Sequence, residues 1–134
     1  METNQNVELL RSTVDALNAG DLETCMARME PEFIINIAGV PQRTGIDTWK
    51  LGVDYFKQAF PDMKATVEDA FGSGDRVAVR LTFTGTHTGE FQGIPATGRT
   101  VTYESNELYR VNDNGLIAEE WICSDMASLF AQLS

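Results

Sequence analysis

The sequence reads TFTGTHTGEFQGIPATGRTV over residues 82–101. This stretch holds the only histidine of the chain, one of its four prolines and several of its eleven glycines. Strand-like residues stand at both of its ends, whereas glycine and proline, which favour turns, fill its middle. The stretch therefore predicts a sheet in which one strand ends, a shaped loop follows and the next strand begins. Loops held by a rigid scaffold often carry function.

Working outward from this stretch, apolar and polar residues alternate, as is typical of half-buried strands. The alternating apolar positions are Met63, Ala65 and Val67, then Val77, Val79, Leu81 and Phe83, then Val101, Tyr103, Tyr109 and Val111, and finally Ile117, Trp121 and Cys123. Residues 112–115 predict a hairpin turn, because a glycine there adopts a positive φ at little cost. An apolar, β-branched run over residues 32–38 predicts one earlier strand.

Helical spacing marks most of the N-terminal part of the chain. Apolar residues recur every three or four positions over residues 4–19, which predicts a first helix. Asp21 can cap a short second helix that ends at Pro31. Similar spacing predicts a third helix over residues 44–60 and a final short helix over residues 126–133.

The order of these elements predicts an α+β fold in a single domain spanning residues 1–134. Helices come first, one strand is inserted among them, and a mainly antiparallel sheet follows. We expect the N-terminal helices to pack on the concave side of this curved sheet. The conical interior that results would suit a small-molecule pocket.

Composition excludes several classes of partner. The 134 residues carry a net charge of −10 and show no basic stripe, so we expect no nucleic-acid partner. The acidic balance argues against anionic membranes, and no run is long and apolar enough to span a bilayer. The polar start at Met1 lacks the features of a signal peptide. Cys25 and Cys123 are expected to be reduced thiols of a cytoplasmic protein.

Motifs for several chemistries are missing from the sequence. One histidine and no cluster with metal-ligand spacing lead us to expect no metal site. The chain has no Gly-x-Ser-x-Gly elbow, and the glycines at 72 and 74 lack the lysine spacing of a phosphate-binding loop.

Asp125 is the sharpest candidate for a catalytic residue. It shares strand parity with Trp121 and Cys123, which we expect to face inward. A carboxylate on an apolar sheet face has a raised pKa and suits general-base chemistry near neutral pH. The alternative is that Asp125 caps the final helix.

His87 and Asn36 are further candidates. His87 has the parity of the apolar residues that precede it and could point into the same interior, either as a catalytic partner or as a hydrogen-bonded structural residue. Asn36 lies among isoleucines on the first strand, and a buried amide needs partners. It could bind a ligand carbonyl or satisfy a neighbouring loop.

Several other residues could form pocket walls or bind substrate. The aromatic candidates are Trp49, Phe56, Phe91 and Trp121, with Ile94 at the rim of the cone, and each could equally be a core residue. Glu104, Asn106 and Glu107 crowd one strand, where adjacent positions cannot all face the pocket. Of these three, Asn106 is the one that we expect to contact substrate.

Taken together, several short segments resemble the SnoaL-like polyketide cyclase family of the nuclear-transport-factor-like superfamily. That superfamily also holds ketosteroid isomerase, scytalone dehydratase and limonene epoxide hydrolase. The segments are Phe60-Pro61-Asp62, Gly74-Asp75-Arg76-Val77, Gly85-Thr86-His87-Thr88-Gly89, Gly93-Ile94-Pro95-Ala96-Thr97-Gly98, and Trp121 followed by Asp125, Leu129 and Gln132-Leu133.

The resemblance implies a cone-shaped α+β barrel that forms a homodimer through the outer face of its sheet. It implies an enzyme without a cofactor, in which an acid removes a proton next to a carbonyl and an intramolecular aldol reaction closes a ring. By its matching motifs, the resemblance implies that Asp125 is this acid and that His87 is a second residue of the site. Some members have a histidine on the strand before the final hairpin, whereas this chain has Glu104, Asn106 and Glu107 there.

The sequence leaves three functions open. The first is an enzyme that acts on a hydrophobic, carbonyl-bearing small molecule by ring closure or isomerisation. The second is a non-catalytic protein that binds such a molecule. The third is an enzyme resembling an epoxide hydrolase, for which Arg80 and Glu104 are the candidate partners of Asp125. Fold alone does not decide among them.

Overall fold

The computed structural model describes residues 3–134, so Met1 and Glu2 of the polar start lie outside the described part. Four helices lie within it: α1 (Thr3–Asn18), α2 (Leu22–Ala27), α3 (Ile46–Ala59) and α4 (Met126–Gln132). α1, α3 and α4 occupy segments that apolar spacing predicted to be helical. α2 lies in its predicted segment but ends at Ala27, before the predicted end at Pro31, because β1 begins at Met29. None of these helices is long and apolar enough to cross a membrane.

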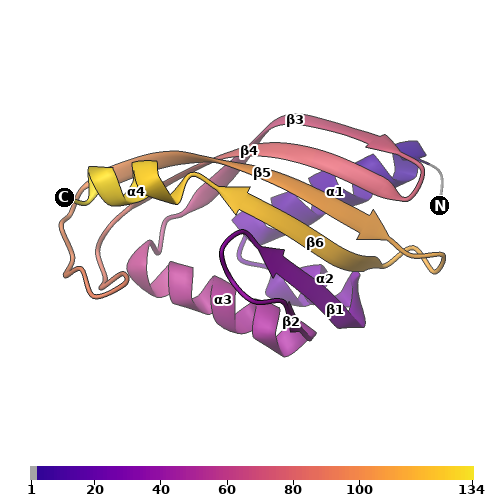
Figure 1. Cartoon of the computed structure of the whole chain (residues 1–134), viewed down its shortest axis with the longest axis horizontal. Coiled ribbons are helices and arrows are strands. Elements are labelled where there is room, and N and C mark those ends of the chain that lie inside the picture. The colour runs from indigo at the N-terminus through magenta and orange to yellow at the C-terminus, as the bar shows by residue number, and fades with distance from the viewer. Residues whose placement is uncertain (1–2) are drawn as a thin grey trace.

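The strands of residues 3–134 form one mixed sheet (Figure 1). They are β1 (Met29–Ile37), β2 (Arg43–Thr44), β3 (Lys64–Ser73), β4 (Arg76–Thr86), β5 (Thr100–Val111) and β6 (Ile117–Ser124). Their order across the sheet is β2-β1-β6-β5-β4-β3. β1 and β6 run parallel, and the other neighbouring pairs are antiparallel. The predicted α+β class, with helices first and a mainly antiparallel sheet, is therefore confirmed.

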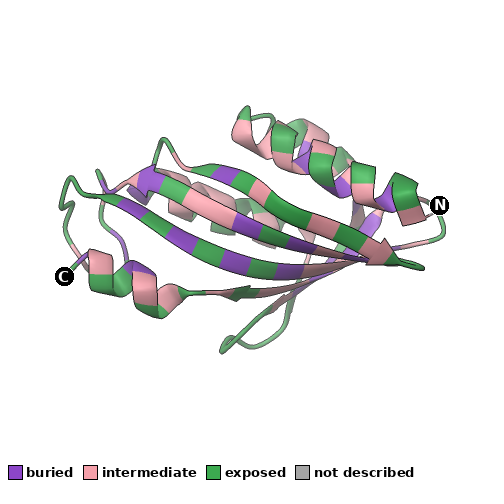
Figure 2. Cartoon of the chain, turned by 90° about the horizontal axis from the view of Figure 1, so that it is seen from above, coloured by how far each residue is buried: buried purple, intermediate pink, exposed green. Residues whose placement is uncertain are grey.

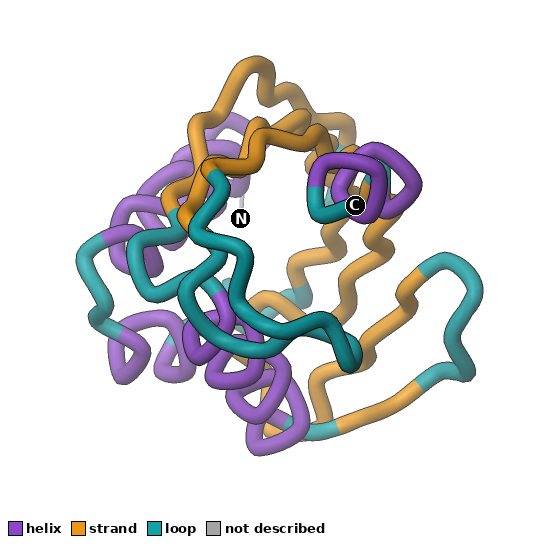
Figure 3. Tube along the Cα trace, turned by 90° about the vertical axis from the view of Figure 1, so that its left-hand side faces the viewer, coloured by secondary structure: helices purple, strands orange, loops and turns teal. Residues whose placement is uncertain are grey.

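The predicted closure of this sheet into a cone-shaped barrel is wrong. Within residues 3–134, β2 and β3 are edge strands, and each has one neighbour in the sheet. β2 is only two residues long, so it offers too short an edge for a ladder of hydrogen bonds across the gap. Figure 3 shows the strands curving over one side of the molecule while most of the helices lie opposite.

The concave face of the sheet carries the buried core. Along β5, buried and exposed residues alternate from Val101 to Glu107, and Figure 2 shows such banding along the strands. The register pairs Leu81 of β4 with Ser105 and Val79 of β4 with Glu107. Paired residues on neighbouring strands share a face, so Ser105 and Glu107 lie on the same buried face as these apolar residues.

Two apolar clusters fill this inner face. The first contains Leu10, Cys25, Met29, Phe33, Ile35, Ala65, Val77, Val79, Leu81, Val111 and Ile117. The second contains Ala59, Phe60, Phe91, Val101, Tyr103, Leu129 and Leu133. Leu10 of α1 belongs to the same cluster as inner-face residues of β4, so α1 packs on the concave side, as predicted.

A β-bulge changes the parity of β6. Arg110 of β5 pairs with Glu119, but the next residue, Val111, pairs with Ile117. Ala118 is therefore an extra residue in β6, and a bulge of this kind shifts which side chains face inward. Ile117 and Ala118 are accordingly both buried although they are neighbours.

The bulge makes the prediction that Trp121 and Cys123 face inward wrong. Beyond it, Glu120 is the buried residue, with 3% of its surface exposed. Trp121 pairs with Leu108 and Cys123 with Asn106, and these β5 residues alternate with the buried ones. Trp121 and Cys123 therefore lie on the outer, convex face of the sheet.

The opening stretch of the sequence forms a strand end, a loop and a strand start, as predicted. β4 ends at Thr86 and β5 begins at Thr100. The backbone N–H of His87 donates to the carbonyl of Arg99 over 2.9 Å, and the N–H of Gly98 donates to the carbonyl of His87 over 2.8 Å. These two hydrogen bonds close the loop at its base.

Gly89 lets this loop lie directly against the end of α3. The backbone N–H groups of Thr88 and Gly89 donate to the carbonyl of Ala59 over 3.0 and 3.1 Å. A β-carbon at Gly89 would overlap the backbone carbonyl of Gln58. The close approach of two backbones therefore requires glycine at this position.

We expect Gly89→Ala to lower the free energy of unfolding by about 1–3 kcal/mol, because the added methyl group forces the loop away from α3. Gly52→Ala is the matched control. Gly52 lies in α3 and has nothing within 4 Å of an added β-carbon, so alanine should stabilise the helix by about 0.5–1 kcal/mol. Urea denaturation of both variants measures the difference. A Gly89→Ala protein as stable as the wild type would contradict the close approach.

Candidate active site

Five polar side chains lie together on the inner face of β5 and β6. They are Ser105, Glu107 and Tyr109 of β5 and Glu120 and Ser124 of β6. The strand register pairs Ser105 with Ser124 and Tyr109 with Glu120, which brings the set to one place. Apolar residues of both clusters lie on the same face, so this polar group is enclosed by apolar side chains.

Glu107 is a buried carboxylate with two hydroxyl donors. Only 8% of its surface is exposed. The hydroxyl of Ser105 donates to its Oε2 over 2.7 Å, and the phenol of Tyr109 donates to its Oε1. Burial raises the pKa of Glu107 above its ordinary value, and the hydrogen bonds from Tyr109 and Ser105 oppose part of that rise.

Glu120 is buried as deeply as Glu107 but has no such donors. Among residues 3–134, its carboxyl group makes no hydrogen bond. Burial and the negative charge of Glu107 raise the pKa of Glu120 well above its ordinary value. The two groups are called the acid pair below: hydroxyl donors favour the charged form of Glu107, whereas Glu120 has none among residues 3–134.

Tyr109 remains a hydrogen-bond donor to the acid pair throughout the physiological range. Burial raises its pKa well above the ordinary value, and the charges of Glu107 and Glu120 raise it further. The phenol therefore keeps its proton, and that proton is directed at Glu107.

This arrangement places two buried carboxyl groups at diagonal positions of neighbouring strands, one with hydroxyl donors and one without such donors among residues 3–134. Two carboxyl groups whose environments separate their pKa values can serve as base and acid near neutral pH. The inner face thus suits removal of a proton from carbon coupled to protonation of oxygen. Within residues 3–134, no group of three or more histidine, cysteine, aspartate or glutamate side chains could hold a metal ion.

The structure places Asp125 at the N-cap of α4. Its side chain is exposed, and its Oδ1 accepts a hydrogen bond from the backbone N–H of Ser128 over 3.0 Å. This is the capping geometry that the sequence left open as the alternative. Trp121 and Cys123 face outward, so shared strand parity with them does not place Asp125 inward. A catalytic role for Asp125 stays a prediction.

His87 faces inward, as its parity predicted, and is fully buried in the part of the core next to Phe60. The backbone N–H of Thr97 donates to its Nδ1 over 3.1 Å, and the hydroxyl of Thr97 lies 2.9 Å from the same nitrogen. Because Nδ1 accepts, the ring proton lies on Nε2, which has no partner among residues 3–134. His87 thus holds the loop to its base, and a role as proton partner stays a prediction.

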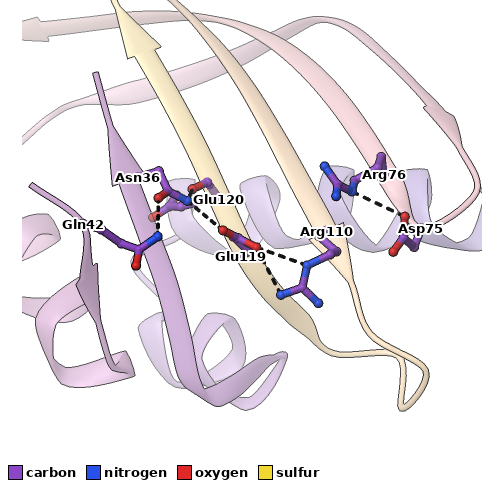
Figure 4. A network of polar contacts seen from close by, with 7 residues as sticks. All are labelled: Asn36, Gln42, Asp75, Arg76, Arg110, Glu119 and Glu120. Carbon is purple, nitrogen blue, oxygen red and sulfur yellow. Dashed lines mark hydrogen bonds and ion pairs between the residues drawn. The ribbon is translucent and has the colours of Figure 1, made fainter. Parts of the chain in front are cut away.

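Asn36 belongs to a polar network on the outer face of β1 and β6 (Figure 4). Its amide nitrogen donates to Glu119 Oε2 over 3.0 Å and to the backbone carbonyl of Glu120 over 2.9 Å. Gln42 donates to its Oδ1 over 2.8 Å, and Arg110 contacts Glu119 at 3.2 Å. The amide of Asn36 is therefore satisfied within the protein, partly by a neighbouring loop.

An open groove of about 400 Å³ runs along the outer face of the sheet. Asn36, Asn106 and Trp121 line it, so the structure brings together three residues predicted to bind substrate. The guanidinium of Arg76 lies 4.9 Å from the Trp121 ring. Glu107 also borders the groove, but its carboxyl group points to the other face. The groove and the acid pair are thus on opposite sides of the sheet.

The remaining candidates for pocket walls lie in the two apolar clusters. Trp49 packs against the first cluster. Phe91 is fully buried in the second, with Phe56 and Ile94 packed against it. The Phe56 and Phe91 rings lie 5.3 Å apart. These contacts match the interpretation of the four as core residues, and substrate contact stays a prediction.

Sequence reasoning missed the acid pair. The sequence did contain a signal for Glu107. If the alternation of apolar and polar residues runs unbroken from Val101 to Val111, every odd-numbered residue of that strand, including Glu107, faces inward. For Glu120 the alternation from Ile117 was misleading, because the bulge at Ala118 reverses it.

The family model for SnoaL-like polyketide cyclases matches residues 7–133. The chain is 28% identical over 131 residues to the aklanonic acid methyl ester cyclase DnrD of Streptomyces peucetius, covering 95% of this chain and 89% of that protein.

Solved structures share the same fold. IdmH of Streptomyces antibioticus, a proposed polyketide cyclase, is 36% identical with a TM-score of 0.85, covering 96% of this chain and 98% of its own. AclR of Streptomyces galilaeus, a proposed hydroxylase, is 30% identical with a TM-score of 0.89, covering 98% of this chain and 82% of its own. The resemblance found in the sequence motifs is therefore confirmed.

Burial of Glu120 predicts that the fold loses stability as pH rises. Its pKa is raised in the folded state, so its contribution is complete below the ordinary glutamate value of about 4.3 and is lost as pH rises through the folded-state pKa. Glu120→Gln removes this titration. We expect the stability of this variant relative to the wild type to increase between about pH 5 and pH 8, as measured by urea denaturation at several pH values.

Asp21→Asn is the control for this experiment. Hydrogen bonds from Thr24 lower the pKa of Asp21, so its contribution is present above the ordinary aspartate value and is lost only in more acidic solution. Its stability difference from the wild type should stay constant across the same pH range. If the stability difference between Glu120→Gln and the wild type is also constant, the pKa of Glu120 is not raised in the folded state.

Proposed function

Because this chain belongs to the SnoaL-like polyketide cyclase family, we propose that it closes a ring in a polyketide substrate through its acid pair. The substrate is a hydrophobic small molecule with a carbonyl next to an acidic carbon. The supporting observation is the pair itself: two carboxyl groups buried on one apolar sheet face, of which one has hydroxyl donors and the other has none in the described part of the chain.

The roles follow from the hydroxyl donors, which favour the charged form of Glu107. Glu107, as the carboxylate, takes the proton from the carbon, and the electrons of the C–H bond form an enolate. Glu120, which keeps its proton, donates to the carbonyl oxygen that the enolate carbon attacks. A carbon–carbon bond forms and that oxygen becomes a hydroxyl group. Transfer of the captured proton from Glu107 to Glu120 restores the starting state, so no proton is gained or lost.

The reaction as written needs no cofactor, because the acceptor and the donor are both side chains of this chain. The apolar clusters beside the acid pair favour binding of a hydrophobic molecule and reduce access of water to the enolate. Aklanonic acid methyl ester, the compound in the name of the relative DnrD, is the first substrate to test.

Two alternatives use the same inner face. A binding protein would take up the compound and release it unchanged, with a rise in thermal stability as the only sign of binding. A hydroxylase, the activity proposed for AclR, would add an oxygen atom. Ring closure by an aldol reaction leaves the mass unchanged, so chromatography with mass spectrometry of the product distinguishes the three outcomes.

An epoxide-hydrolase-like activity has weaker support. Arg80 and Glu104, its candidate residues, form an ion pair with a separation of 3.6 Å, and both are about half exposed or more. Their register positions on β4 and β5 place them on the outer face, whereas the acid pair lies on the inner face. They therefore do not converge with a buried carboxylate.

Substitutions separate the proposed roles of the acidic residues. Glu107→Gln should lower the rate of cyclisation by about 10²- to 10⁴-fold, because the base is lost. Glu120→Gln should lower it less, by roughly tenfold, because the amide still donates a hydrogen bond to the carbonyl oxygen. Rates are measured from product formation with aklanonic acid methyl ester at a fixed pH.

Asp125→Asn is the matched control. Asparagine caps helices as well as aspartate does, so the fold should be retained, and we expect a rate close to that of the wild type. A large loss of rate in Asp125→Asn, with Glu107→Gln unaffected, would return the catalytic role to Asp125.

The outer face supports the homodimer that the family resemblance implied. Phe71, in edge strand β3, is 64% exposed on that face. Trp121 lies on the same face in β6, with β4 and β5 between the two strands. A second copy would cover this apolar surface. We expect sedimentation analysis to show a dimer, and Phe71→Lys to shift it toward monomer because a charge would be buried without a partner. A wild-type monomer at all concentrations would contradict the proposal.

A further inference from the structure

The hydroxyl groups around Glu107 form a chain with a fixed direction. The hydroxyl of Ser105 donates to Glu107 Oε2 over 2.7 Å. The hydroxyls of Ser105 and Ser124 lie 2.9 Å apart, so one must donate to the other. A serine hydroxyl has one proton, and that of Ser105 is already given to Glu107. Ser124 is therefore the donor, and both protons point toward Glu107.

Tyr109 completes this set of donors from the other side. Its phenol donates to Glu107 Oε1, so each oxygen of Glu107 accepts a hydroxyl proton. Hydrogen bonds of this kind stabilise the charged form of a carboxyl group. Glu120, on the neighbouring strand and equally buried, has no hydroxyl donor among residues 3–134.

The two carboxyl groups therefore differ chiefly in their donors. Both lie on the same inner face and both are nearly inaccessible to solvent. Burial alone would disfavour the charge on either of them to a similar extent. The asymmetry between base and acid must then come from the hydroxyl groups on β5 and β6.

We propose that Ser105 and Tyr109 are positioning residues that place the negative charge of the acid pair on Glu107, and that Ser124 orients Ser105 for this role. The assignment of base and acid in the proposed function rests on this placement. Without the two hydroxyls, Glu107 loses its advantage over Glu120, and the proton is shared between the two groups or moves to Glu107.

The test follows the titration of each acid directly. Protein labelled with ¹³C at the glutamate side-chain carboxyl gives one NMR signal per glutamate, and Glu107→Gln and Glu120→Gln identify the two signals. In the wild type, the Glu107 signal should titrate at lower pH than the Glu120 signal. In the Ser105→Ala/Tyr109→Phe double variant, the midpoint of Glu107 should rise by about one pH unit or more. The midpoint of Glu120 should fall.

Matched variants separate this role from simple packing. Ser105→Thr keeps a hydroxyl and should retain the wild-type order, whereas Ser105→Ala alone should raise the midpoint of Glu107. Tyr103→Phe removes a buried phenol that is not bonded to Glu107 and should leave the order unchanged. Ser124→Ala should give a smaller rise than Ser105→Ala. If the double variant does not fold, the single variants Ser105→Ala and Tyr109→Phe carry the same test.

Two results would overturn the proposal. One is a double variant, or both single variants, in which Glu107 keeps its midpoint and still ionises before Glu120. The other is a Ser105→Thr protein that behaves as Ser105→Ala does. Because the NMR titration needs no substrate, it is independent of ring closure. A failure to cyclise any polyketide would count against the proposed function alone.

Discussion

The unbroken pairing of β4 with β5 is the constraint on which the rest of the structure depends. It runs without a register shift from Arg76 opposite Arg110 to Thr86 opposite Thr100. Over this length the side chains of both strands keep strict alternation, so one face holds the apolar core and the other faces outward. The same alternation places Glu107 inside the core, where the hydroxyl groups of Ser105 and Tyr109 offset part of the cost of burying its charge.

Much of the fold could be predicted from the sequence because it depends on local periodicity. The helices, the strands flanking the opening stretch and the hairpin at residues 112–115 each have a pattern that a short window contains. Closure of the sheet could not be predicted in this way, since it depends on the length of β2 and on where α1 and α3 lie. The bulge at Ala118 leaves no clear mark in the sequence either, and it reversed the orientation expected for Trp121.

The candidate site depends on the pairing of two strands, which the sequence does not show one residue at a time. Asp125 was predicted to be catalytic because it shares strand parity with Trp121 and matches a motif position, yet its side chain caps a helix. The acid pair becomes visible only when two strands are placed in register, because Glu107 and Glu120 are thirteen positions apart in sequence. Family membership narrows the range of reactions to test. The different surroundings of the two carboxyl groups suggest how one sheet face could supply both a proton acceptor and a proton donor.

The loop between β4 and β5 has a consequence for how such proteins can diverge. Its base is closed by paired backbone hydrogen bonds between His87 and the residues just before β5, and the ring of His87 accepts from Thr97. Between these anchors, Gly89 and Phe91 are fixed by their packing against α3 and in the second cluster. We expect change to be tolerated at the exposed residues 95 and 96, because extending a closed loop costs little entropy. The most distinctive stretch of the sequence therefore has room to vary only at its exposed tip, while the strand after it carries Glu107 of the acid pair.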